Sequence, residues 1–134
     1  MNNGPVIAVG QSSVSATYDT HVWGIEWTIV NKSVSTIMIR SARLPHGQFK
    51  SSEQRFDPPL ELEGGGQVAF RALVHCDEPP GFVTENAFII FQVLWCKEPW
   101  RLFVRIRVVV EQTGEPRTSV QLITTQRVGF SASS

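Results

Sequence analysis

Apolar and polar side chains alternate along the segment Trp100–Glu111. Its even positions are all apolar: Trp100, Leu102, Val104, Ile106, Val108 and Val110. Three of the odd positions between them hold arginine. Successive side chains on a β-strand point to opposite faces of the sheet, so this alternation predicts a strand with one buried face. The same pattern over Val22–Val30 and Gln67–His75 predicts an all-β chain.

Clusters of glycine, proline and polar residues separate several further apolar stretches. The additional strands that we predict are Pro5–Val9, Val14–Tyr18, Ser35–Arg40, Ala42–Phe49, Pro59–Glu63, Ala87–Trp95 and Val120–Thr125. The segment Gly64-Gly65-Gly66 predicts a tight hairpin turn, and Ser51–Arg55 is a helix-tolerant stretch that Pro58-Pro59 ends at once. About seven to nine short strands predict an antiparallel β-sandwich. We expect a single domain over residues 1–134, with residues 131–134 as a flexible tail.

Two parts of the sequence resemble the immunoglobulin-like sandwiches of many bacterial proteins. The first is WTIVNKSVSTIMIRSARLPHGQF at residues 27–49, in which a strand ending in Asn and Ser precedes a short Ile-rich strand. The second is LELEGGGQVAFRALV at residues 60–74, with a leucine strand, a glycine turn and an alternating strand. The resemblance implies an immunoglobulin-like fold. The sequence departs from antibody-type domains, because it lacks their Cys–Trp–Cys spacing and a clear tyrosine corner. A fold shared by so many functions implies no chemistry of its own.

The charge balance disfavours a nucleic acid or an anionic membrane as partner. Twelve Lys and Arg residues face twelve Asp and Glu residues, so the net charge is zero, and neither half of the chain forms a charged arm. Binding to such partners draws most of its affinity from clustered positive charge. The most apolar stretch, Ala87–Cys96, is about half the ~20 residues of a membrane-spanning helix. With no signal peptide visible, we expect a cytoplasmic protein and no membrane partner.

The two cysteines, Cys76 and Cys96, are expected to be free thiols. If Gln67–His75 pairs with Asn86–Cys96, the two residues lie on the order of 34 Å apart. A disulfide needs Cα atoms within about 7 Å. Free thiols are typical of a reducing compartment, in agreement with the cytoplasmic prediction.

The tetrapeptide His75-Cys76-Asp77-Glu78 carries four residue types that can bind a metal ion. A zinc site needs three or four converging ligands, and the remaining histidines, His21 and His46, each stand alone. Neighbouring strand residues point to opposite faces, so His75 is badly placed to activate Cys76. We therefore predict no catalytic residue, no metal and no cofactor. A metal or thiol site at His75-Cys76 stays the weaker alternative.

The candidate interaction surface lies on and beside Trp100–Glu111. Its residues are Trp95, Trp100, Arg101, Phe103, Arg105 and Arg107. The three arginines and Phe103 share one side of the strand, a pattern that can bind a nucleic-acid backbone with base stacking on the ring. One aromatic ring and zero net charge disfavour that interpretation, and pairing with neighbouring carboxylates would explain the arginines as well. Trp95 and Trp100 flank a hairpin tip and are expected to cap the core as a cross-strand pair; exposed, they would suit a sugar or a protein.

These observations predict a non-catalytic binding module whose partner is a protein or a second copy of the chain. A carbohydrate- or small-ligand-binding sandwich that uses exposed tryptophans is the first alternative. Ala87–Trp95 is apolar on both sides of the strand, so Ile89, Phe91 and Val93, or the residues that alternate with them, would face outward in a two-layer sandwich. A monomer rarely exposes a large apolar patch, and this predicts a homodimer.

Overall fold

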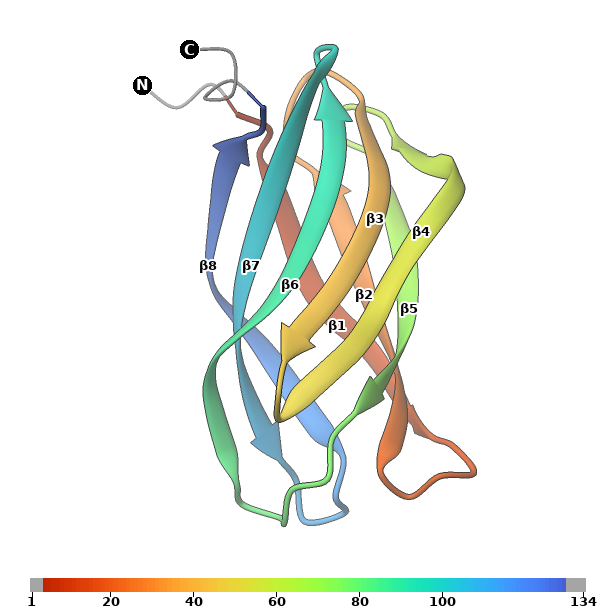
Figure 1. Cartoon of the computed structure of the whole chain (residues 1–134), viewed down its shortest axis with the longest axis vertical. Helices are drawn as coiled ribbons and strands as arrows, with labels where there is room; N and C mark the ends of the chain where they lie inside the picture. The colour runs from red at the N-terminus through yellow and green to blue at the C-terminus, as the bar shows by residue number, and fades with distance from the viewer. Residues whose placement is uncertain (1–3, 130–134) are drawn as a thin grey trace.

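The computed structural model describes residues 4–129, apart from the side chain of His46, and the predicted tail at 131–134 lies outside them. The described chain is all-β, as the alternation predicts (Figure 1). Its eight strands are β1 (Ile7–Ala16), β2 (Val22–Asn31), β3 (Ile37–His46), β4 (Phe49–Leu62), β5 (Gln67–His75), β6 (Val83–Trp95), β7 (Glu98–Val110) and β8 (Pro116–Arg127).

Hydrogen bonds join the eight strands into a single antiparallel sheet in the order β1-β2-β5-β4-β3-β6-β7-β8. The sheet curls so far that it is nearly barrel-shaped, with β1, β2 and β5 behind β3, β6 and β7 in Figure 1. The predicted sandwich would have two separately bonded layers, whereas here the β3–β4 hairpin links both halves. The connection between β4 and β5 is weak, because these two strands share a single residue pair, Lys50 with His75.

The core fills the inside of the curled sheet with the alternate residues that the sequence pattern picks out. Ile25, Trp27 and Ile29 of β2 are fully buried, and so are the even positions of β7 from Leu102 onward. The Trp27 ring stacks on Phe70, with centroids 5.7 Å apart. Phe70 in turn meets Phe91 edge to face at 5.7 Å, so aromatic rings from β2, β5 and β6 connect opposite walls of the barrel.

Two predicted divisions between strands are wrong, and bulges explain both. Pro5–Val9 and Val14–Tyr18 belong to the one strand β1, whose register shifts between Gln11 and Ser13. Ser35–Arg40 and Ala42–Phe49 likewise fall largely in β3, whose register shifts between Ile39 and Ser41. An extra residue in a strand reverses the alternation, so the pattern breaks without the strand ending. The helix-tolerant stretch Ser51–Arg55 lies inside β4, held by its pairing with β3.

Asn31, at the end of β2, ties together the turns at the upper end of the barrel. Its buried side chain donates hydrogen bonds to the carbonyl oxygens of Ser35 (2.9 Å) and Leu62 (2.8 Å). Its side-chain oxygen accepts one from the Ser33 backbone N–H at 2.8 Å. The Gly64 backbone lies so close that a Cβ there would overlap the carbonyl oxygen of Val34. The Asn and glycine positions that carry the family resemblance therefore have a structural role here.

Candidate functional site

The odd residues of β7 lie on its outward side, as the alternation predicts. Arg101, Phe103, Arg105 and Arg107 are each partly exposed, between fully buried neighbours. The strand lies on the left of the molecule in Figure 1, flanked by β6 and β8. Its outward side chains therefore form part of a broad sheet face.

Strands β3 and β6 add residues to this face that the sequence analysis missed. In one row across the sheet, Arg43 of β3 lies opposite Ile90 of β6, and Ile90 lies opposite Phe103 of β7. In a neighbouring row, Phe88 lies opposite Arg105. We use the name basic face for the outward residues Arg40, Arg43, Phe88, Arg101, Phe103 and Arg105.

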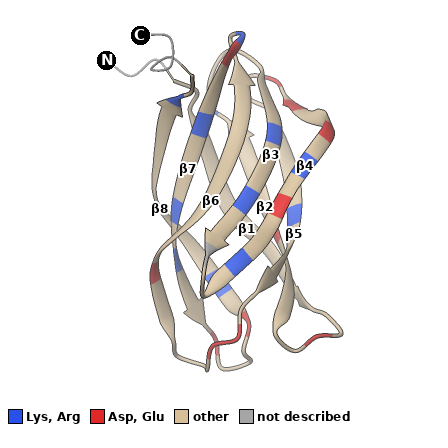
Figure 2. Cartoon of the chain, in the orientation of Figure 1, with Lys and Arg blue, Asp and Glu red and all other residues tan. Residues whose placement is uncertain are grey.

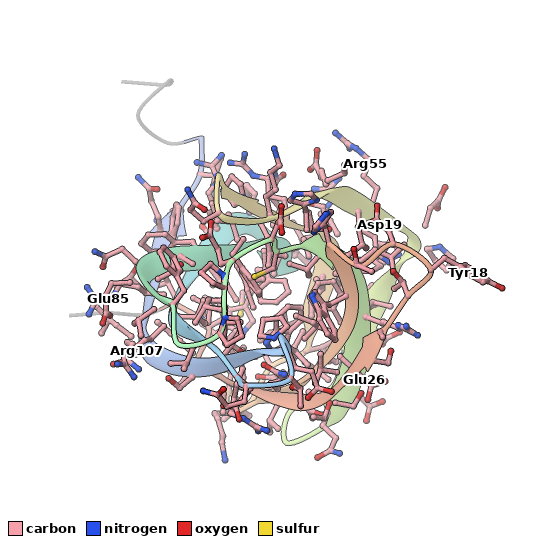
Figure 3. All side chains as sticks on the ribbon, turned by 90° about the horizontal axis from the view of Figure 1, so that it is seen from below. Tyr18, Asp19, Glu26, Arg55, Glu85 and Arg107 are labelled. Atoms are coloured by element: carbon pink, nitrogen blue, oxygen red, sulfur yellow. The ribbon has the colours of Figure 1, made fainter. Side chains whose placement is uncertain are left out.

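Carboxylates are few on the strands of the basic face, although Glu53 and Glu61 of the neighbouring strand β4 lie along its β3 side, Glu61 opposite Met38. Strands β3 and β8 contain no Asp or Glu, and β6 and β7 contain one each, Glu85 and Glu98. Glu85 pairs with Arg107 at 3.0 Å and Glu98 with Arg127 at 3.4 Å, both near strand ends. Figure 3 shows Glu85 and Arg107 side by side at the edge of the barrel. Arg107, a predicted surface residue, is thus neutralised and does not belong to the basic face.

The four arginines of the basic face, at positions 40, 43, 101 and 105, form no ion pair with any residue that the structure describes. Figure 2 shows the positive residues of β3 and β7 on the same side of the molecule, with β6 passing between the two strands. The Nε of Arg101 is also buried and has no hydrogen-bond partner within residues 4–129.

Two phenylalanine rings lie among the arginines. Phe88 and Phe103 meet edge to face, with centroids 6.5 Å apart and an interplanar angle of 90°. Both are partly exposed, while Ile90 beside them is only 7% exposed. Arginine stems and rings can cover apolar surface while their polar ends stay in water. The basic face therefore combines positive charge with accessible aromatic carbon.

Strand β6 has one side in the core and one side on the outer surface of the sheet. Ile89, Phe91 and Val93 point into the core, and the alternate residues, Ile90 among them, point outward. Since Ile90 is covered by its neighbours, the outward side lacks the continuous apolar strip from which the homodimer was predicted. Self-association stays a prediction, without that argument.

Trp95 and Trp100 lie at the upper end of the core and face inward, away from the basic face. Their rings meet edge to face at 6.0 Å, and Trp100 is 6% exposed. The guanidinium carbon of Arg127 lies 5.3 Å from the centroid of the Trp100 ring and helps to cover it. This arrangement agrees with the core-capping interpretation and leaves no exposed pair of rings for a sugar.

His75 and Cys76 do not form a reactive pair. Cys76 is buried at the lower end of β5, whereas His75 is exposed. Burial raises the pKa of the Cys76 thiol above its ordinary value of 9.0; the charges of Glu78 and Asp77 act in the same direction, against a backbone hydrogen bond at Glu78. The nearby histidine His21 binds Asp77 instead, at 2.7 Å. Within the described residues, no three His, Cys, Asp or Glu side chains gather as a metal site would require.

Both cysteines are free, as predicted, although the strand pairing assumed for that prediction is wrong. β5 pairs with β2 and β4, not with β6. Cys76 follows the lower end of β5, and Cys96 lies in the turn between β6 and β7 at the opposite end of the barrel.

Two clefts that are partly lined by apolar residues lie away from the basic face. One of about 510 Å³ follows the opening between β4 and β5 and is lined by Lys50, Leu73 and His75, among others. Another, of about 280 Å³, lies at the lower end beside Trp23, Cys76 and Asp77. Neither brings together a set of groups that suits a particular reaction.

No known protein-family model matches the sequence, and no curated protein is similar to it. Across residues 4–129, no helix is long and apolar enough to cross a membrane. The site must therefore be interpreted from its own chemistry.

Proposed function

We propose that the chain is a non-catalytic binding module that recognises an anionic macromolecule through the basic face. The observation that carries the proposal is the set of four arginines on one sheet face without a carboxylate partner among the described residues. A guanidinium group presents several N–H donors in a plane and binds phosphate or carboxylate groups through paired hydrogen bonds.

The sheet suits this role because it holds the backbone of its arginines rigidly. The backbone of Arg101 and Arg105 is held in β7, which is paired on both edges and packed in the core on its other side. Because the backbone of these residues is already ordered, a ligand that binds them loses less free energy to ordering than one that binds residues of a flexible loop.

We further propose an immunoglobulin-like topology for this support. The order β1-β2-β5-β4 corresponds to strands A, B, E and D of such domains, and β3-β6-β7 corresponds to C, F and G. β8 is then an additional strand beside G. β4 departs from this arrangement, because it pairs along β3 and shares a single pair with β5, its expected neighbour.

The alternatives have weaker support. A carbohydrate site would use exposed tryptophans, but Trp95 and Trp100 pack against each other in the core. A thiol site would need a thiolate, and the raised pKa of Cys76 keeps its thiol protonated near neutral pH. The two free cysteines fit the reducing, cytoplasmic compartment that we propose.

Retention on immobilised heparin, a general polyanion, tests the proposal. The double variant Arg101→Gln/Arg105→Gln removes two unpaired charges, and Arg107→Gln/Arg117→Gln removes two charges that Glu85 and Glu111 already neutralise. We expect the first variant to elute at clearly lower salt than the wild type and the second to elute close to it. Equal elution of both variants would mean that net charge, and not the basic face, causes retention.

A further inference from the structure

We infer that the anionic macromolecule is a single-stranded nucleic acid. This inference rests on the proposed function and names its ligand. It depends on two features of the basic face. The first is the position of the carboxylates, which the net charge of the chain does not show. The second is the number of aromatic rings among the arginines, which the sequence of β7 alone does not show.

Most of the carboxylates lie away from the β6–β7 part of the basic face, while Glu53, Asp57 and Glu61 of β4 border the face on its β3 side (Figure 2). Five of the carboxylates are in the loops at the lower end of the barrel: Asp19, Asp77, Glu78, Glu111 and Glu115. Figure 2 shows acidic residues in these lower loops and none on β3. Exposed charges separated by more than about 8–10 Å are largely screened at moderate salt. A ligand over β6 and β7 therefore meets local positive charge, because the two carboxylates of these strands are paired with Arg107 and Arg127, although the whole chain is neutral.

The aromatic rings distinguish nucleic acid from an acidic peptide. Phe88 joins Phe103 from the neighbouring strand, so the face has two partly exposed rings where β7 alone has one. Bases stack on such rings regardless of their sequence, and arginines between the rings hold the phosphates. A peptide rich in Asp and Glu would use the arginines and leave both rings without a partner. Single-stranded nucleic acid uses every residue type of the face.

The spacing along β7 fits this use. At about 3.4 Å per residue, Phe103 lies about 7 Å along the strand from Arg101 and the same distance from Arg105. A base stacked on the Phe103 ring would thus have a guanidinium group on each side for its flanking phosphates. Arg43, in the same row as Phe103, extends the positive surface toward β3. The face is a sheet without a protruding helix, whereas reading a duplex usually needs an element inserted into a groove.

Fluorescence anisotropy with a labelled oligo(dT) of about 12 nucleotides, within the usual ~4–16 nucleotide site, tests the inference. We expect binding whose log–log salt slope is about −2.8 if all four arginines contact phosphates, and about −1.4 for Arg101→Gln/Arg105→Gln. Phe103→Leu should weaken binding about five-fold or more through lost stacking. Phe82→Leu, which changes an exposed ring outside the face, and Arg107→Gln/Arg117→Gln should bind like the wild type.

Two competitors separate this inference from the proposed function: a poly-glutamate peptide and a duplex of the same length. Binding of poly-glutamate but not of oligo(dT), with dependence on Arg101 and Arg105, would overturn the inference and leave the proposed function standing. Absence of binding to either would overturn both. Oligo(dT) binding that survives both Phe103→Leu and Arg101→Gln/Arg105→Gln, or a preference for the duplex, would also overturn the inference. Circular dichroism melting checks that each variant folds. If Arg101→Gln/Arg105→Gln does not fold, Arg40→Gln/Arg43→Gln repeats the charge test on β3.

Discussion

The side-chain oxygen of Gln11 accepts two hydrogen bonds from Thr118, one from its backbone N–H and one from its hydroxyl group, each 2.7 Å long. Gln11 lies at the bulge of β1, and its amide nitrogen also donates to the carbonyl oxygen of Pro116 at 3.3 Å. No backbone pair joins β1 to β8 within the described residues. One glutamine side chain thus takes the place of strand pairing where the barrel closes, and Trp27 reinforces it by donating to the Thr118 hydroxyl at 3.1 Å.

Gln11→Ala should lower the free energy of unfolding by about 2 kcal/mol, because the partly buried Thr118 N–H loses its acceptor. Urea unfolding measures the change. Gln121→Ala is the control: its exposed side chain bonds only to nearby Ser119, so we expect a loss of less than about 0.5 kcal/mol. Equal losses in the two variants would show that Gln11 does not close the barrel.

Asn31→Ala should cost more, about 2–4 kcal/mol, because the buried carbonyl group of Leu62 and the partly buried carbonyl group of Ser35 lose their donor. The midpoint of thermal or urea unfolding reports this loss. Asn86→Gly changes an exposed asparagine that already has a positive φ of 61°, a conformation that glycine adopts easily. A wild-type midpoint for Asn31→Ala would mean that the upper turns hold together without this side chain.

Phe91→Glu should prevent folding, because Phe91 is fully buried against Phe70 and a carboxylate there would have no cation beside it. Gln92→Glu, on the outward side of the same strand, should fold normally. Circular dichroism spectra compare the two variants. A folded Phe91→Glu would reverse the assignment of inward and outward sides of β6 and revive the outward apolar strip as a dimer surface.

The buried thiol of Cys76 should make stability depend on alkaline pH. Its pKa is raised in the folded state, mainly by burial, so the folded protein favours the neutral thiol. This contribution is complete below the ordinary pKa of 9.0 and is lost as the pH rises through the folded-state pKa. The difference in unfolding free energy between wild type and Cys76→Ala should therefore shrink between neutral pH and about pH 10. A difference that stays constant or grows would contradict the burial of the thiol.

The fold class was predictable because alternation is local. Trp100–Glu111 and Gln67–His75 show which side chains are inward without any knowledge of their neighbours, and the structure agrees. Bulges were not predictable in this way: the extra residue near Gln11 breaks the alternation of β1 just as a turn would. The closure of the sheet depends on contacts such as Gln11 with Thr118, which are more than a hundred residues apart in the chain.

Only part of the candidate site was predictable, because the rest depends on contacts between strands that are far apart in the sequence. Arg101, Phe103 and Arg105 follow from the pattern of one strand, but Arg43 and Phe88 join them only through the pairing of β6 with both β3 and β7. One signal was available: no Asp or Glu occurs between Glu26 and Glu53, nor after Glu115. The distribution of charge along the sequence thus indicates an uneven distribution of charge on the surface, although the net charge is zero.

The most direct test of the basic face is a titration of the ¹⁵N-labelled protein with oligo(dT) and, separately, with poly-glutamate, followed by the backbone amide resonances. If the basic face is the recognition surface, the shifts concentrate in β3, β6 and β7, near Arg43, Phe88 and Phe103, with either anion that binds. Shifts confined to the lower loops or to the cleft between β4 and β5, or no shifts with either anion, would contradict the account.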